Sequence, residues 1–259
     1  MQTKNKLTFL ILFSLTFCLL SFNLNADEFN IEAREILVDK ENEILTGVGS
    51  VTATDMEGKI IKADKITYEK SREFLLAKGN VTITDIEGNI LNADKATYDK
   101  LNDIIKTYAK TEVMLREGYK LATKNSLYDV KNKILSSKDI SILTDKDGNY
   151  IETSMFQYQI ANNLFSSIGK IKIIDVNKNK YFFKEIHVDT KKKEMIGSDV
   201  SVVLDQKNFG VSESSDPRFV ANDIMIKENI TSLSKGVFTI CKKRDGKCPP
   251  WSLKAKKIS

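Results

Sequence analysis

Residues 49–68 read GSVTATDMEGKIIKADKITY, and the stretch returns 30 residues later, at 79–98, as GNVTITDIEGNILNADKATY. The two copies are identical at 13 of 20 positions. The offset of 30 persists where the identity fades, because it also spaces Gly58, Gly88, Gly118 and Gly148, and Tyr68, Tyr98, Tyr128 and Tyr158. A fixed period in this range is typical of stacked structural units. The sequence therefore predicts a repeat array from residue 31 to about residue 210.

Within one unit, apolar and polar residues alternate, as from Leu75 through Ala77 to Val81 and Ile83. This period of two indicates β-strands with one buried and one solvated face. The alternation slips once per unit, as between Ala93 and the next apolar residue, Ala96, which indicates a bulge or a sheet corner. The repeated glycines predict tight turns, because glycine readily adopts positive φ. Each unit is expected to be strand, turn, bent strand, turn.

Three columns of apolar residues recur with the period and are the candidates for lining the interior. The members singled out are Ile61, Leu75, Ile83, Leu91, Ile105, Val113, Leu121, Leu135, Leu143, Ile151 and Phe165. Two interpretations stay open on the pattern alone: a closed sandwich core, or an open apolar groove that holds lipid. A column of mostly small residues favours a groove with room in it: Gly47, Ala77, Thr107, Ser137, Ser167 and Gly197.

Composition argues against several functional classes. The 40 Lys and Arg against 35 Asp and Glu give a formal charge of +5, too balanced to indicate a nucleic-acid partner. His187 is the only histidine, so a Ser-His-Asp or Cys-His arrangement is nearly excluded, and it is expected at the surface of a strand. We find no phosphate-binding loop or metal-ligand spacing. The sequence predicts a protein that is not an enzyme and that has no cofactor and no metal.

The two ends carry further signals. Residues 1–26 have a charged start, an apolar stretch from Leu7 to Leu20 and a cleavage site before Asp27, as in a secretory signal peptide. Cys241 and Cys248 are disulfide candidates in an oxidising compartment, with two unpaired thiols as the alternative. Repeats fill 27–210, and 211–259 holds the last repeats, which stop inside an unfinished strand. Unpaired sheet edges are expected near 31–38 and 253–258.

The motif GNVTITDIEGNILNADKATY resembles the OstA domain shared by the lipopolysaccharide transport proteins LptA, LptC and LptD. The later stretches DPR at 216–218, LSKGVFTIC at 233–241, CPPW at 248–251 and KAKKI at 254–258 resemble LptD just before its outer-membrane barrel. The resemblance implies an all-β fold, a twisted β-jellyroll or "β-taco" with an open apolar groove for acyl chains. In that family, cysteines of this domain pair with cysteines near the barrel, which is absent here.

The function that this resemblance implies is lipopolysaccharide binding in the periplasm, at the inner face of the outer membrane, as in the N-terminal part of LptD. The implied partners are lipopolysaccharide, an LptA-like bridge protein that pairs with an edge strand, and an LptE-like lipoprotein only if a barrel follows. The alternatives are an LptA- or LptC-like bridge component and a structural β-solenoid without a lipid ligand.

Overall fold

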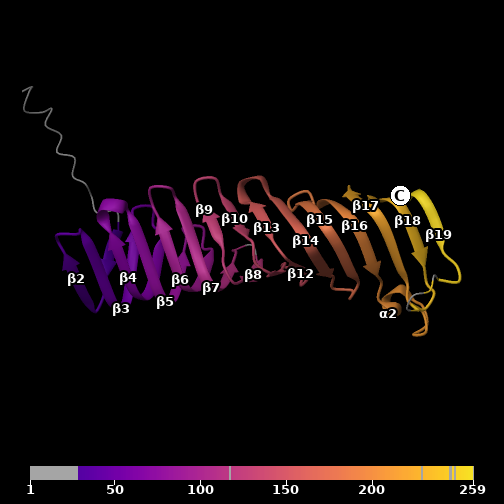
Figure 1. The fold of residues 1–259 in the computed structure, drawn as a ribbon, viewed down its shortest axis with the longest axis horizontal. Coiled ribbons are helices and arrows are strands. Elements are labelled where there is room, and N and C mark those ends of the chain that lie inside the picture. The colour runs from indigo at the N-terminus through magenta and orange to yellow at the C-terminus, as the bar shows by residue number, and fades with distance from the viewer. Residues whose placement is uncertain (1–28, 117, 229, 245–246, 248, 259) are drawn as a thin grey trace, which may run out of the picture.

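The computed structural model describes residues 29–116, 118–228, 230–244, 247 and 249–258, so the predicted signal peptide lies outside the described residues. The described strands follow one another along the long axis of the molecule (Figure 1). They are β1 (Phe29–Glu32), β2 (Glu35–Asp39), β3 (Ile44–Asp55), β4 (Ile60–Glu69), β5 (Phe74–Thr84), β6 (Ile90–Asp99), β7 (Ile104–Met114), β8 (Lys120–Thr123), β9 (Leu127–Asp129), β10 (Ile134–Ser137), β11 (Ser141–Thr144), β12 (Tyr150–Thr153), β13 (Phe156–Gln159), β14 (Leu164–Ile174), β15 (Lys180–Asp189), β16 (Glu194–Val203), β17 (Arg218–Lys227), β18 (Ile230–Thr239) and β19 (Leu253–Ile258). The only α-helix among the described residues is the four-residue α2 (Gln206–Phe209). The predicted all-β, jellyroll-like fold is confirmed.

All described strands pair antiparallel into one continuous sheet that is bent along its length into two walls. The glycine-turn wall comprises the strand segments that lead to the turns at Gly58, Gly88, Gly118 and Gly148, including β8, β11 and β12. The tyrosine wall comprises the segments that carry Tyr68, Tyr98, Tyr128 and Tyr158, including β9, β10 and β13. Long strands such as β5 run through both walls, whereas the chain at 120–159 places a separate short strand in each.

The predicted corner lies where long strands pass from one wall to the other. The register of β4 against β5 shifts between Lys62 and Lys65, where Gly79 and Asn80 on β5 both have positive φ. A β-carbon on Gly79 would clash with the Asp64 carboxylate, so this position requires glycine for its surroundings as well as for its backbone. One extra residue on β5 bends the sheet here, as a β-bulge does.

In the middle of the chain the corner is lined by buried hydroxyl groups instead of alanine and valine. The side chains involved are Thr107, Thr111, Thr123, Ser126, Ser137, Ser141, Thr153 and Ser167. Ser141 Oγ donates to the Asp139 carbonyl and lies 3.0 Å from Thr123 Oγ1, and Ser137 Oγ donates to the Asn125 carbonyl. Because the strands are interrupted at this point, the hydroxyls pair backbone groups that no ladder satisfies.

The predicted glycine turns are confirmed, since Gly58, Gly88, Gly118 and Gly148 all have positive φ. An unpredicted set of side-chain bonds ties these turns together. Asp145 Oδ1 accepts from the backbone N–H groups of Asp147 and Asn149, and Asn149 Nδ2 donates to Asp145 Oδ2. Asn149 Oδ1 then accepts from the N–H of Val176 in the next turn, and Asn89 and Asn179 make the equivalent link to Arg116 and Asp205.

The opposite turns hold a left-handed position that carries no glycine. The residues are Glu43, Glu73, Asp103, Lys133, Asn163 and Lys193, again 30 apart, and all have positive φ. Sequence reasoning missed them because the usual glycine signal is absent at these positions.

The interior divides into two apolar clusters along the long axis. The N-terminal cluster includes Phe29, Ile61, Ile66 and Leu75 and is tightly filled. The C-terminal cluster extends from Val113 to Leu233. The sheet continues into β17–β19 because β16 pairs directly with β17, so the loop at 204–217 interrupts the sequence but not the ladder. Among the described strands, β2 pairs only with β3, and β19 only with β18, which confirms the predicted edge positions.

Candidate ligand-binding trough

Two cavities lie between the walls in the middle of the molecule. The first, of about 110 Å³, is lined by Val113, Leu115, Tyr119, Lys120, Leu121, Leu135, Leu143, Asp145, Ile151, Phe156, Tyr158, Phe165, Ile173, Ile186, Val188 and Thr190. The second, of about 60 Å³, is lined by Lys59, Ile83, Asp85, Asn89, Ile90, Leu91, Ile105, Val113, Leu115, Tyr128, Leu135 and Ile160. Val113, Leu115 and Leu135 line both, so the two cavities are neighbours, and together they are called the trough.

Nine of the eleven predicted interior residues line this trough, from Ile83 to Phe165. Ile61 and Leu75 do not line either cavity. Both are 1% exposed and pack inside the N-terminal cluster, where the space between the walls is filled by other side chains. The predicted groove is therefore a cavity only in part of the array, and the closed-core interpretation describes the other part.

The chemistry of the trough is that of a hydrophobic container. Its inner lining consists of aliphatic and aromatic side chains, and polar groups such as Lys120, Asp85 and Asn89 come from the turns and the strand ends beside them. Across the part of the chain that the structure describes, no group of three His, Cys, Asp or Glu side chains could hold a metal ion. His187 is exposed and contacts Ser166 and Glu185, which confirms its predicted surface position.

One turn at the trough departs from the Asp and Asn pattern of its neighbours. Leu115 stands where Asp85 and Asp145 bind their turns, and Tyr119 stands where Asn89 and Asn149 link them. Both Leu115 and Tyr119 line the first cavity. Leu115 in place of Asp and Tyr119 in place of Asn can both be seen in the sequence. Their significance depends on the hydrogen bonds that Asp and Asn make in the other turns.

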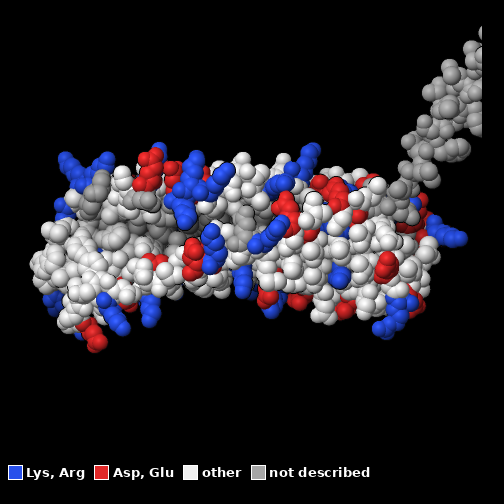
Figure 2. All heavy atoms as spheres, turned by 180° about the vertical axis from the view of Figure 1, so that it is seen from behind, with Lys and Arg blue, Asp and Glu red and all other residues white. Residues whose placement is uncertain are grey.

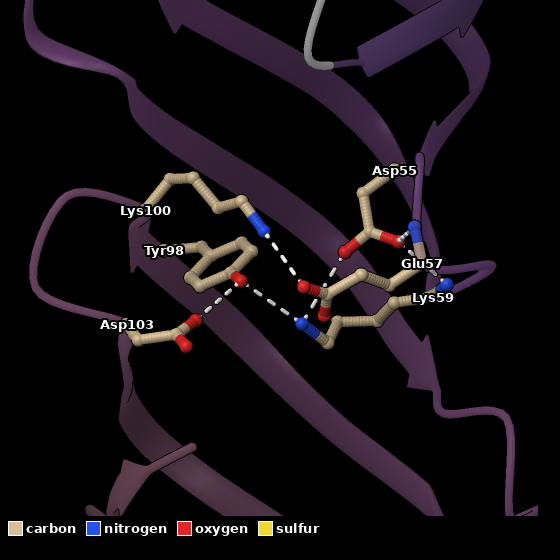
Figure 3. A network of polar contacts seen from close by, with 6 residues as sticks. All are labelled: Asp55, Glu57, Lys59, Tyr98, Lys100 and Asp103. Carbon is tan, nitrogen blue, oxygen red and sulfur yellow. Dashed lines mark hydrogen bonds and ion pairs between the residues drawn. The ribbon is translucent and has the colours of Figure 1, made fainter. Parts of the chain in front are cut away.

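Lys59, which lines the second cavity, belongs to a polar network whose members are drawn in Figure 3. Lys59 Nζ donates to the Tyr98 hydroxyl at 3.0 Å, and that hydroxyl donates to Asp103 Oδ1 at 2.8 Å. Lys59 Nζ also lies 3.3 Å from Asp55 Oδ2, an ion pair without hydrogen-bond geometry. Burial, followed by the hydrogen bond to Asp103, raises the pKa of Tyr98, so its hydroxyl stays protonated and can serve both partners.

Two ion pairs at the surface, in which Lys100 is half-buried and the other three side chains are exposed, join the turns of the two walls in the same half of the molecule. Lys100 Nζ lies 3.5 Å from Glu57 Oε1, and Lys133 Nζ lies 3.7 Å from Glu87 Oε1. Exposed pairs of this kind contribute at most about 1 kcal/mol each. They hold the turns near each other weakly, whereas the Lys59 network is buried.

Three further features concern the cysteines, membrane-spanning helices and the charge of the surface. Cys241 is partly exposed with a free thiol, and Cys248 lies outside the described residues, so their pairing stays a prediction. Within the described ranges no helix is long and apolar enough to cross a membrane. The face in Figure 2 carries charges of both signs interspersed along its length.

Comparison with known proteins adds little to this geometry. No family model and no curated protein matches the sequence. Among solved structures, the chain is similar to LptH from Pseudomonas aeruginosa, described as the LptA homologous periplasmic component of the lipopolysaccharide transport device. The identity is 13%, over 42% of this chain and 82% of that one, with a TM-score of 0.38. It is also similar to the TCP10 domain of Danio rerio CPAP, at 12% identity over 74% and 94% of the two chains, with a TM-score of 0.18.

The fold and the site together define a class: an elongated protein whose bent β-sheet encloses an apolar trough.

Proposed function

We propose that this protein is a lipid-binding carrier, not an enzyme, and that it holds acyl chains of an amphipathic lipid in the trough between its two walls. The observation that carries the proposal is that two apolar cavities lie side by side and share Val113, Leu115 and Leu135 in their linings. An ordered row of apolar side chains with unfilled space beside it is unusual in a protein interior, which is normally close-packed.

The dimensions of the trough suit an elongated apolar chain. Along the glycine-turn wall the lining runs from Ile83 on β5 to Ile173 on β14, through β6, β7, β8, β11 and β12. Six strand spacings of roughly 4.8 Å give a length of about 30 Å. Each buried methylene contributes roughly 0.8 kcal/mol, so several acyl carbons bind firmly without any hydrogen-bonding code.

The specific lipid that we propose is lipopolysaccharide, and the compartment is the periplasm at the inner face of the outer membrane. The support is the resemblance of residues 79–98 and 216–258 to the OstA and LptD patterns, together with an apolar trough of the kind that acyl chains need. In this proposal the protein delivers lipopolysaccharide as the N-terminal part of LptD does, or bridges the periplasm as LptA and LptC do.

An edge strand is the proposed contact for an LptA-like partner. On β2, Ile36, Leu37 and Val38 are 44%, 54% and 61% exposed, and β2 has no second partner among the described strands. Exposed apolar edge strands readily accept another strand. An LptE-like lipoprotein enters the proposal only if a barrel follows.

Photo-crosslinking with purified lipopolysaccharide tests the function. A photoreactive residue at Ile105 or Leu135 should capture the lipid, because both side chains line the trough. The controls are Lys106, which follows Ile105 on β7, and Thr82 on β5, because both side chains lie on the other face of the sheet. Equal capture at inward and outward positions, or none at either, contradicts the proposal and favours a structural β-solenoid. The filled N-terminal cluster is also consistent with such a solenoid.

A further inference from the structure

The trough ends before the array does. Neither cavity includes a residue of β1 to β3, and the second cavity reaches its N-terminal limit at Lys59. Beyond that point the space between the walls is occupied by Phe29, Val51, Ile66 and Leu75, none of them more than 5% exposed. A ligand in the trough thus meets packed side chains in this direction.

An aromatic side chain from outside the long strands plugs this end. Phe29 lies on the short strand β1, which pairs with β3 in the glycine-turn wall. Its ring packs edge-on against two rings of the opposite wall, Tyr68 at 5.1 Å and Tyr98 at 6.0 Å between centroids. Phe29 therefore fills the gap between the walls at the point where the tyrosine column begins.

Charged groups border the plug on the side of the trough. The Asp55 side chain is fully buried and pairs with Lys59, which also binds Tyr98. An apolar chain that advanced past Lys59 would have to separate this buried pair or desolvate it further, and either change is costly. The network thus opposes the passage of an apolar acyl chain, which is the ligand that the rest of the trough favours.

We infer that Phe29, Lys59 and Tyr98 form an end wall, so that bound acyl chains occupy the trough from Ile83 to Val188 and do not pass through the N-terminal end of the array. This inference rests on the proposed lipid-binding function. Transfer of lipid across the β2 edge to or from an LptA-like partner, as a bridging role needs, would require this wall to open.

The repeat supplies a matched set of probe positions. Tyr68, Tyr128 and Tyr158 occupy the same column of the tyrosine wall, with Tyr68 behind the end wall and the other two in the trough. Each can be replaced singly by the photoreactive p-benzoylphenylalanine, which preserves an aromatic ring. With purified lipopolysaccharide, we expect capture at Tyr128 and Tyr158 and only background at Tyr68. Circular dichroism of each protein checks the fold, and a second probe at Ile31, packed on the same cluster, replaces Tyr68 if that variant is unfolded.

Opening the wall provides the positive control. Phe29→Ala removes the plug, and Asp55→Asn with Lys59→Met removes both charges together. In the triple variant, capture at Tyr68 should rise from background to the level seen at Tyr128. Capture at Tyr68 equal to that at Tyr128 in the unmodified protein would overturn the end wall and leave lipid binding standing. Continued background at Tyr68 in a folded triple variant also contradicts it, and no capture at any position removes both proposals.

Discussion

The Nζ atom of Lys59 lies 3.0 Å from the hydroxyl of Tyr98, and this contact joins a turn of the glycine-turn wall to strand β6 in the tyrosine wall, 39 residues apart in the chain. Lys59 occupies the column in which Asn89, Asn149 and Asn179 link neighbouring turns along one wall. Lys59 therefore stands at the position that is asparagine in those turns. The asparagine side chains bond along the sheet, whereas the Lys59 side chain bonds across the interior.

The first prediction concerns the stability of this network. Lys59→Met should lower the free energy of unfolding by about 3–5 kcal/mol, because it leaves the fully buried Asp55 carboxylate without its cation. Adding Asp55→Asn should restore most of the loss, since the pair is then removed together and an asparagine can still bind the turn. Urea unfolding of the single and double variants measures both effects. A double variant no more stable than Lys59→Met would show that the ion pair is not the cause.

The second prediction compares two leucines from one column of the tyrosine wall. Leu75→Ala should cost about 2–5 kcal/mol, as for a leucine in a close-packed core. Leu135→Ala should cost less than Leu75→Ala, about 2 kcal/mol at the low end of that range, because Leu135 borders both cavities and has fewer contacts to lose. Chemical denaturation of the two variants measures the loss in the free energy of unfolding of each. Equal losses would mean that the trough is filled as completely as the N-terminal cluster.

The third prediction concerns the links between turns. Asn149→Ala removes one bond within its turn and one to the N–H of Val176, so we expect a loss of about 1–3 kcal/mol. The matched control is Asn132→Ala, because the exposed Asn132 side chain bonds only Asp129 in its own turn. A comparable loss from both substitutions, measured by thermal or urea unfolding, would assign the effect to the turn and not to the link.

The fourth prediction concerns alkaline pH. Burial, followed by the hydrogen bond to Asp175, raises the pKa of Tyr181 to about 12. The unfolded chain then loses this proton first, at a pKa of roughly 10, so stability is complete below that pH and declines as the pH rises towards 12. Tyr181→Phe should make the decline between pH 10 and 12 shallower. Unfolding curves across this range test it, and parallel pH profiles for the two proteins would argue against it.

The fifth prediction concerns lipid capture. Leu135→Asp should abolish crosslinking at Ile105, because an ionised carboxylate inside an apolar trough is costly to desolvate and repels acyl chains. Ser136→Asp is the control, since Ser136 neighbours Leu135 on β10 and points away from the trough. Circular dichroism must show both variants folded. Undiminished capture in a folded Leu135→Asp protein would place the lipid elsewhere.

Several features of this protein follow from the sequence by itself. The 30-residue period, the alternation along each strand and the glycine turns are local properties, and they predicted the strands, the turns at Gly58 and Gly148 and the bend near Ala93. Such features can be recognised from sequence because strand pattern and positive φ depend on a few neighbouring residues. The left-handed conformation at Glu73 and Asp103 was not predicted, because neither position carries the glycine that usually indicates it.

The tertiary structure alone decided which part of the repeat is open. Leu75 and Leu135 occupy the same column and look equivalent in sequence, yet Leu75 is enclosed and Leu135 borders the cavities. The difference comes from side chains of the opposite wall and from Phe29 and Lys59, which approach only when distant segments fold together. Whether the space between the two walls is filled depends on the total volume of the side chains that both walls contribute. The pattern within a single strand carries no information about that total.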